Sequence, residues 1–254
     1  MERKQQKLLV ETAALAGELM LSSGAETFRA EDTMAHILRK GTTAQVTPVA
    51  LTTSILVTLE DAENEPLTIV RRVPSGSTKL SRIVRINEIS RNFCDDKITL
   101  EEAYDQLTHL QGYEYNRFLY NLGTIGVGVG FALFFGGSGL DAFATCIASG
   151  ILALLITFGK KTKMAGFIVN CISCAGMSFV CALLKDILFP AMDMDTVIVS
   201  SLMPLVPGVA ITNAVRDTLQ GDYISGSARM LEAFLKAASI ALGVGIGVML
   251  YRLF

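Results

Sequence analysis

Long apolar runs in the second half of the chain constrain its fold more than any other feature. An α-helix rises about 1.5 Å per residue, so about 20 apolar residues cross the roughly 30 Å hydrocarbon core of a bilayer. Five segments approach that length and hold few charges: residues 118–135, 140–158, 164–184, 197–213 and 231–251. The sequence therefore predicts an α-helical integral membrane protein with about five transmembrane helices, whose first partner is the lipid membrane.

The first half of the chain has a different composition. Residues 1–117 hold 14 of the 22 Lys and Arg and 17 of the 24 Asp and Glu. The net charge of −2 is a balance of mixed signs, which does not indicate nucleic-acid binding. Residues 1–17 lack an uninterrupted apolar core and a small-residue cleavage site, so we expect no signal peptide. We predict an N-terminal cytoplasmic α/β domain over residues 1–114 and a transmembrane domain over residues 115–254.

Local patterns suggest the elements of the N-terminal domain. Val, Thr, Leu and Ile are enriched in residues 45–59 and 67–73, which predicts a β-hairpin joined by the polar residues 61–66. Helical spacing or capping signals predict helices at residues 7–20, 27–40, 79–93 and 100–110. Thr99 should cap the last of these, with Glu101 and Glu102 in its first turn.

Basic residues in the short loops predict the orientation, because Lys and Arg resist translocation across the membrane. They occur before the first run, between the second and third and between the fourth and fifth: Arg117, Lys160, Lys161, Lys163, Arg216 and Arg229. Five spans then place the N-terminal half in the cytoplasm and the C-terminus outside the cell (plasma or inner) membrane. The alternative has four spans, with residues 197–213 forming a re-entrant or surface segment.

The order of several motifs resembles the threonine/serine exporter family over essentially the whole chain. The motifs are LSSGAETFRAE at residues 21–31, INEISR at 86–91, LEEA at 100–103 and PLVPG at 204–208, followed by Asn213, Arg216-Asp217, Gly221-Asp222 and Ser225-Gly226. Full-length members carry a second membrane block, whereas this chain stops at its fifth predicted span. It is therefore similar to the short form, a subunit of a two-component succinate exporter.

The resemblance implies a secondary-active exporter of small polar metabolites, either threonine and serine or a dicarboxylate such as succinate. It also implies a second small multi-span membrane protein as partner, and a homo- or hetero-oligomer. No phosphate-binding loop occurs in the sequence, so transport would be driven by a gradient. The alternative is a membrane sensor or scaffold that does not transport.

The fourth run contains the residues most suggestive of a substrate path. Pro204 and Pro207 each remove a backbone donor, and Gly208 adds flexibility. Transporters often build substrate sites from helices that are broken inside the membrane. Asn213, on the same segment, and Asn170, in the third run, supply amide groups that could face such a path. The alternatives are a proline-kinked packing helix and an Asn that bonds a neighbouring helix.

Arg216 and Asp217 follow this break, at the predicted cytoplasmic mouth. An Arg guanidinium can bind a carboxylate through two parallel hydrogen bonds, which favours Arg216 as a substrate contact. The alternative is a solvated network in which the Arg residues only set the topology.

The N-terminal half offers Glu26, Arg29, Glu31 and Arg91 as candidates. Glu26 and Arg29 are spaced i, i+3 on one helix face, as in an exposed ion pair. We favour a head that gates or senses substrate, with Arg29 and Arg91 as contacts. A hydrolase with Glu26 as base is disfavoured, because no nucleophile, metal cluster or phosphate loop accompanies it. We therefore predict no catalytic residue, cofactor or metal.

Two small-residue features should serve packing. Gly126–Gly130 and Gly243–Gly247 each contain a small-xxx-small pair that lets two membrane helices approach closely. Cys171 and Cys174 have the spacing of a redox or zinc pair, but they lie in an apolar run without a nearby His, so we expect them to pack.

Overall fold

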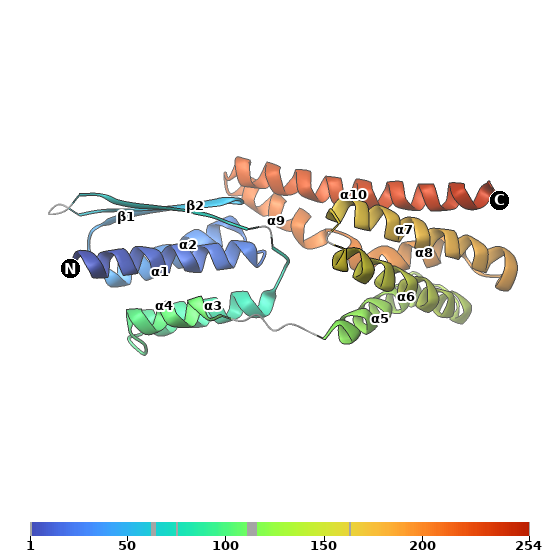
Figure 1. Cartoon of the computed structure of the whole chain (residues 1–254), viewed down its shortest axis with the longest axis horizontal. Helices are drawn as coiled ribbons and strands as arrows, with labels where there is room; N and C mark the ends of the chain where they lie inside the picture. The colour runs from blue at the N-terminus through green and yellow to red at the C-terminus, as the bar shows by residue number, and fades with distance from the viewer. Residues whose placement is uncertain (1, 62–64, 75, 111–115, 163, 254) are drawn as a thin grey trace. The chain divides into compact units, whose positions relative to one another are not determined.

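A computed structural model of the chain describes residues 2–61, 65–74, 76–110, 116–162 and 164–253 (Figure 1). The chain is mostly helical, as predicted, and it forms two compact units. The head unit comprises Met1–Glu114 and Val209–Leu231, and the span unit comprises Tyr115–Gly208 and Glu232–Phe254. Residues 209–231, which the sequence analysis assigned to the transmembrane domain, thus group with the head unit.

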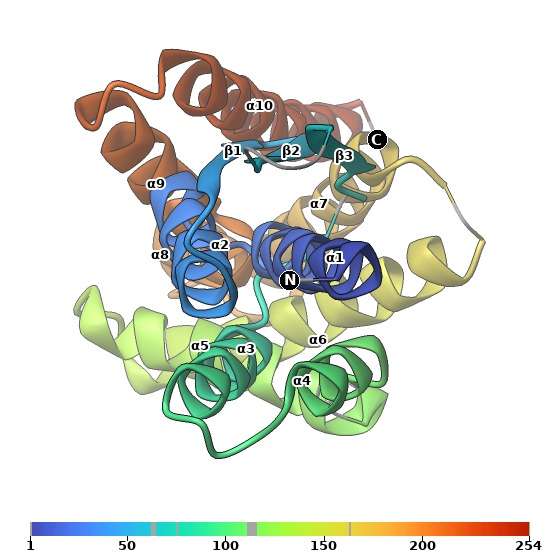
Figure 2. The ribbon, with the colours of Figure 1, turned by 90° about the vertical axis from the view of Figure 1, so that its left-hand side faces the viewer.

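The head unit is built in three layers (Figures 1 and 2). Helices α1 (Arg3–Ser22) and α2 (Thr27–Gly41) form the middle layer, with the sheet on one side and α3 (Leu80–Cys94) and α4 (Leu100–Thr108) on the other. The largest fully buried side chains of this core include Leu9, Met20, Met34, Ile55 and Ile86. Thr99 and Glu102 form a capping box at the start of α4, as the sequence predicted for Thr99.

The sheet of the head unit is small and antiparallel, with strand order β1-β2-β3. Its strands are β1 (Gln45–Leu51), β2 (Ser54–Glu60) and β3 (Leu67–Arg72). The predicted first strand, residues 45–59, is therefore wrong as one element, since it folds back after Leu51. No Gly, Asn or Pro marks the turn at Thr52-Thr53, so the pattern looked continuous. Three short strands among helices match the predicted α/β class only in part.

A tight turn joins α1 to α2 and fixes the start of α2. Ala25 N donates to Met20 O at 3.0 Å and Gly24 N donates to Leu21 O at 3.0 Å, which is the Schellman pattern of a helix C-terminus. Gly24 has φ +83°, which favours glycine, and a Cβ added there would lie 3.2 Å from Thr78 Cα. The turn thereby presents the carbonyls of Gly24 and Ala25 together with Glu26, the N-cap of α2.

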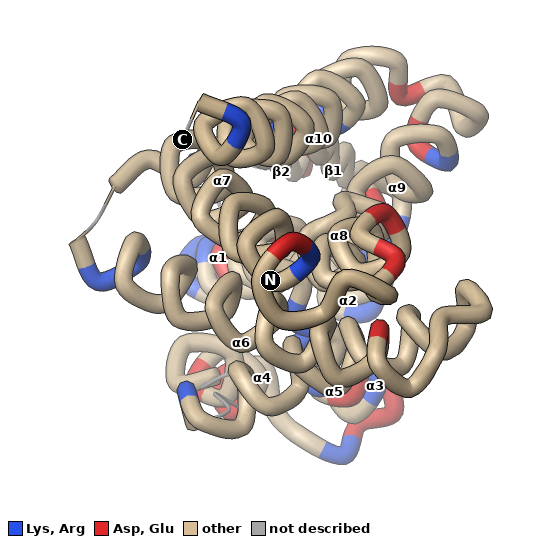
Figure 3. The backbone as a smooth tube through the Cα atoms, turned by 90° about the vertical axis from the view of Figure 1, so that its right-hand side faces the viewer, with Lys and Arg blue, Asp and Glu red and all other residues tan. Residues whose placement is uncertain are grey.

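The span unit consists of apolar helices whose charged residues gather near the helix ends (Figure 3). Four helices of the described residues are long and apolar enough to cross a membrane, or five if one broken pair counts as a single span. The four are α5 (Arg117–Phe134), α6 (Gly139–Lys161), α7 (Gly166–Leu183, extended by a π-helical turn to Leu188) and α10 (Tyr223–Arg252). Helix α10 begins eight residues before the predicted fifth run, because its first two turns belong to the head unit.

The broken pair is the predicted fourth span. Helix α8 (Met194–Leu202) passes into a 3-10 turn at Met203–Leu205, and α9 (Gly208–Leu219) begins after Pro207. Proline lacks the amide hydrogen that a continuous helix needs, which explains a break at Pro204 and Pro207. The sequence therefore predicted both the location and the cause of this interruption.

Glycines bring helices of the span unit together at two places. A Cβ on Gly243 or Gly247 of α10 would lie 2.4 Å from Cys171 O or 2.1 Å from Ala175 O of α7. This confirms the predicted close approach for Gly243–Gly247. In the first glycine run the central residue, Gly128, faces Ser149 of α6, whereas no described atom lies within 4 Å of a Cβ on Gly126 or Gly130.

Candidate functional site

A buried carboxylate ties α9 to the start of α2 within the head unit. Asp217 has no solvent exposure, and it accepts hydrogen bonds from the backbone N and the Oγ1 of Thr27, each at 3.1 Å. Thr27 is the first residue of α2, whose N-cap side chain makes no capping bond. Asp217 therefore caps α2 from another element, where the positive end of the helix dipole favours a negative charge.

Two further side chains complete this connection. Arg229, near the start of α10, lies 3.0 Å through Nε from Asp217 Oδ2, and its Nη2 donates to Ala25 O at 2.8 Å. Asn213 donates through Nδ2 to Gly24 O at 2.9 Å. Because the carbonyls belong to the α1–α2 turn, these bonds hold α9 and the first turns of α10 to that turn. Asn213 and Asp217, which the sequence analysis considered for a substrate path, thus serve this connection.

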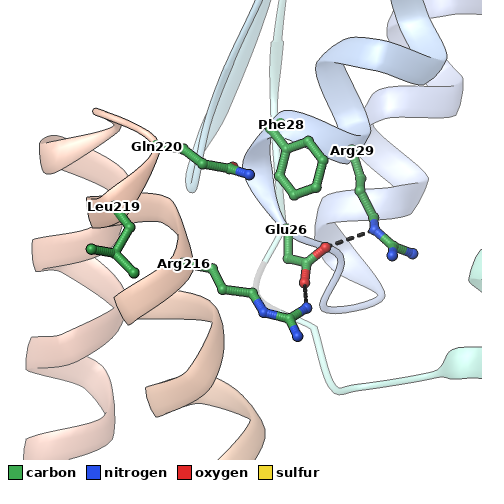
Figure 4. A pocket seen from close by; sticks show the side chains of 6 residues that line it. All are labelled: Glu26, Phe28, Arg29, Arg216, Leu219 and Gln220. Atoms are coloured by element: carbon green, nitrogen blue, oxygen red, sulfur yellow. Dashed lines mark hydrogen bonds and ion pairs between the residues drawn. The ribbon is translucent and has the colours of Figure 1, made fainter.

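A second carboxylate, Glu26, forms ion pairs with two arginines at the edge of the same cluster. Its side chain is only 7% exposed, and Oε2 lies 2.7 Å from Arg29 Nε while Oε1 pairs with Arg216 Nη1. The side chains of Arg29 and Arg216 are themselves 55% and 56% exposed. Figure 4 shows both of them directed at the single Glu26 carboxylate.

An open pocket of about 310 Å³ surrounds this triad. Its lining residues come from the start of α2 and from the end of α9 with the residue that follows: Glu26, Phe28, Arg29, Arg216, Leu219 and Gln220 (Figure 4). Two arginines against one glutamate give the lining a net charge of +1. Each arginine uses one nitrogen on Glu26, and its remaining N–H groups bond no described residue, so the pocket can donate several hydrogen bonds to an anion.

Two more carboxyl groups of the head unit are held in partly buried surroundings. Burial raises the pKa of Glu31 above its ordinary value, and the charge of Asp222 raises it further, against the hydrogen bond that Ala50 N donates at 2.8 Å. Burial also raises the pKa of Asp222, with a further contribution from the charge of Asp217. Both groups therefore hold a proton more readily than an exposed carboxyl does.

The remaining predicted residues lie away from the pocket lining. Arg91 is exposed in the last turn of α3. Asn170 is half-buried on α7, in the span unit. Pro204 lies in the 3-10 turn, Pro207 is buried in the break, and Gly208 starts α9. The structure thus brings together Glu26, Arg29 and Arg216 of the predicted candidates, and it places Asn213 and Asp217 beside them.

Sequence reasoning missed the partners that link distant segments. Thr27 and Asp217 are 190 residues apart, and no spacing rule joins them. Phe28, Leu219 and Gln220 carry no chemical signal of their own. Only the motif resemblance, which includes both residues 21–31 and 213–226, pointed to these two segments together.

Among the described residues, no group of three or more His, Cys, Asp or Glu could hold a metal ion. Cys171 and Cys174 are free thiols on α7, where α10 packs against them at Gly243.

Comparison with known proteins supplies the family. The family model for threonine/serine exporters, ThrE, matches residues 11–251. A protein of Mycobacterium tuberculosis named as a probable threonine/serine exporter is 25% identical over 245 residues, which cover 95% of this chain and 46% of that protein. The chain thus spans about half the length of this curated relative. No solved structure matches the chain. With its apolar helices, it is a multi-pass membrane protein, and it belongs to the threonine/serine exporter family.

Proposed function

We propose that this chain is a subunit of a secondary-active exporter of small carboxylate-bearing metabolites, either threonine and serine or a dicarboxylate such as succinate. The observation that carries the proposal is that two exposed arginine side chains, Arg29 and Arg216, pair with the buried Glu26. Exposed ion pairs add little stability, whereas guanidinium forks recognise carboxylates with defined geometry. The pocket would receive the substrate carboxylate before transport.

The break between α8 and α9 supports a substrate route through the membrane. A helix that is interrupted inside a bilayer leaves backbone groups that must be buried in protein or face a water-filled cavity. Pro204, Pro207 and Gly208 form this interruption, and α9 leads from it to Arg216 in the pocket. The same polypeptide segment would therefore line the route and contribute to recognition of the substrate.

The contacts of the head unit also support five membrane crossings. Asp217 and Arg216 bond the α1–α2 turn, so the end of α9 lies on the same side of the membrane as the head unit. Helices α5, α6 and α7 make three crossings and leave the chain on the opposite side. The α8–α9 pair must then cross back, and α10 crosses a fifth time. We propose, with the support of the basic loops, that the head is in the cytoplasm and the C-terminus outside the inner (plasma) membrane.

We further propose that a second small multi-span membrane protein completes the exporter, in a homo- or hetero-oligomer. Support comes from the resemblance of the sequence motifs to the two-component form of the family. The pocket would bind its substrate without transforming it, since the described residues that line it include no Ser, Thr, Cys, His or Lys.

Efflux of labelled threonine, serine and succinate tests the function. Cells preloaded with each compound would express this chain, its candidate partner, or both. The proposal expects faster loss of at least one compound when the chain is present. Equal efflux with and without the chain, at normal membrane expression, would instead favour a sensor or scaffold.

Arg216→Lys tests recognition by the guanidinium. Lysine keeps the charge but loses the fork, so we expect efflux at subsaturating substrate to fall about tenfold or more. Arg39→Lys, the same change at an exposed position of α2, is the matched control and should leave efflux unchanged. Parental rates in Arg216→Lys would argue against the carboxylate pocket.

The interruption can be tested in the same assay. Replacing Pro207 and Gly208 together by Ala restores a backbone donor and helix propensity, so we expect efflux to drop while membrane insertion stays normal. Full activity in that variant would remove the break from the route.

A further inference from the structure

Three serine hydroxyls inside the span unit are buried without a partner. Ser149 of α6 and Ser200 and Ser201 of α8 have no solvent exposure, and their Oγ atoms make no hydrogen bond to any described residue. Leaving a buried hydroxyl unsatisfied costs about 1–3 kcal/mol. Several other buried hydroxyls of this unit are satisfied: Ser178 Oγ, for example, lies 3.2 Å from both Ala175 O and Val244 O. The unsatisfied serines therefore need an explanation.

The three serines lie at one depth. Helices α6 and α8 contact each other and begin side by side, because Asp193 N donates to Asp141 Oδ1 at 2.7 Å. Ser149 follows Asp141 by eight residues, and Ser200 and Ser201 follow Asp193 by seven and eight. At about 1.5 Å per residue, all three are about 11–12 Å along their helices from that contact. Ser149 is also near the middle of the 23-residue helix α6.

A third helix approaches closely at this depth. Helix α5 packs against both α6 and α8, and its Gly128 faces the hydroxyl of Ser149. A Cβ at Gly128 would lie 2.2 Å from Ser149 Oγ and 3.3 Å from Thr145 Cγ2. A side chain larger than glycine would therefore displace the Ser149 hydroxyl, which lies where that Cβ would be.

The electrostatics at this depth favour a small cation. Helix α8 ends at Leu202, directly after Ser201, so the negative end of its dipole lies beside the serines. Each hydroxyl oxygen offers lone pairs as acceptor. No Lys, Arg, Asp or Glu occurs in residues 124–132, 145–153 or 197–202. A neutral, oxygen-lined site suits a monovalent ion or an ammonium group, as at the half-helix ends of other transporters.

We propose that Ser149, Ser200 and Ser201 form a midplane site for a small cationic group, which is either a sodium ion or the primary ammonium of the cargo. The inference rests on the proposed function and deepens it. The head pocket would bind the carboxylate of the substrate, and the three serines would bind a small cationic group at a second place. The broken end of α8 would supply backbone carbonyls to the same site.

Ligand-induced stabilisation of the purified full chain in detergent tests the site without requiring transport. The probes are sodium chloride, methylammonium chloride and, as a bulky control at equal ionic strength, choline chloride. We expect sodium or methylammonium to raise the melting temperature, and choline to have no such effect. Stabilisation by sodium alone would favour a coupling ion as the occupant of the site. Stabilisation by methylammonium alone would favour the ammonium of the cargo, and stabilisation by both would indicate a site that accepts either.

The triple variant Ser149→Ala/Ser200→Ala/Ser201→Ala should lose the response by at least tenfold in apparent affinity. Its melting temperature without added ion should equal or exceed that of the parent, because it lacks three unsatisfied hydroxyls. Gly128→Ala, which keeps all three hydroxyls but displaces that of Ser149, should weaken the response as well. Ser178→Ala, an equally buried serine whose hydroxyl is satisfied, should retain it.

The inference is overturned if neither ion stabilises the parent, if the triple variant responds like the parent, or if Ser178→Ala loses the response equally. Failure of the efflux assay with an intact ion response would remove the exporter proposal and leave the cation site. If efflux depends on Arg216 but neither ion stabilises the chain, the cation site is wrong and the exporter proposal stands.

Discussion

At the scale of single residues, the head unit depends on a charge pair held almost out of water. Asp217 is fully buried, and the Arg229 side chain is 12% exposed. Removing one member of such a pair leaves an uncompensated charge, whereas removing both avoids that penalty. The pair therefore connects α9 and α10 to the head without having to add much net stability.

This account predicts the outcome of a double-mutant cycle on the purified chain. Asp217→Asn should destabilise the head unit by about 3–5 kcal/mol, because Arg229 keeps a charge without its partner. Asp217→Asn with Arg229→Met should cost clearly less than the sum of the single changes. Thermal unfolding in detergent measures both, with Asp105→Asn, exposed on α4, as control. Additive costs would mean that the two side chains are not coupled.

Glu31 yields a prediction in which pH changes the result. A carboxyl whose folded pKa is raised contributes stability that is present below its ordinary pKa, near 4.5, and is lost as pH rises through the folded value. Glu31→Gln keeps an acceptor for Ala50 N and removes the loss of stability that accompanies ionisation of Glu31. The variant should have the same melting temperature as the parent near pH 4 and a higher one near pH 7. The corresponding gain in the free energy of unfolding should be less than about 1 kcal/mol, because the site is partly solvated. A lower melting temperature at pH 7 would contradict this.

The sequence predicted the contact between Glu26 and Arg29 but not the one between Thr27 and Asp217, and the difference is physical. An i, i+3 pair is set by helix geometry alone. A bond across 190 residues depends on the packing of α9 against the α1–α2 turn, which no local pattern encodes. Arg216 was proposed as a carboxylate ligand, yet its sharing of Glu26 with Arg29 emerged only from the fold.

At the scale of elements, the same distinction separates the spans from the strands. Long apolar runs and prolines act locally, so α5, α6, α7 and the break before α9 followed from the sequence. The turn between β1 and β2 has no glycine or asparagine and went unnoticed. Similarly, two matching glycine runs gave no sign that only Gly243–Gly247 would place its outer glycines against another helix.

Helix contact at α10 provides a test with a control on the same helix. Gly243→Ala would bring a Cβ to 2.4 Å from Cys171 O and 2.8 Å from Cys174 Cβ, so α7 and α10 would have to separate. We expect a loss of about 1–3 kcal/mol, as for other overpacked sites. Gly245→Ala meets no described atom within 4 Å and should be tolerated. Comparison of their melting temperatures with the parent decides the matter, and equal values would contradict the close approach.

At the scale of the whole molecule, the main difference from the sequence-based division concerns residues 209–231. Their apolar composition continues that of the spans, yet their contacts belong to the head unit. Exposed apolar side chains on α9, such as Val209, Val215 and Leu219, explain why composition alone assigned this segment to the membrane. Its polar face, with Asn213 and Asp217, is the part that bonds the α1–α2 turn and the start of α2.

The claim on which the function depends is that the broken α8–α9 pair crosses the membrane and delivers Arg216 to the head. Single cysteines can test it in a background without the five native ones. They would replace exposed residues of α2, of the segment after α9 and of the first turn of α8: Arg39, Gln220 and Asp195.

An impermeant maleimide, added to intact cells or to inverted vesicles, measures on which side each cysteine lies. The account predicts that positions 39 and 220 react from the same side and position 195 from the opposite side. If position 220 reacts together with position 195, the pair does not cross, and the proposed route through the membrane is wrong.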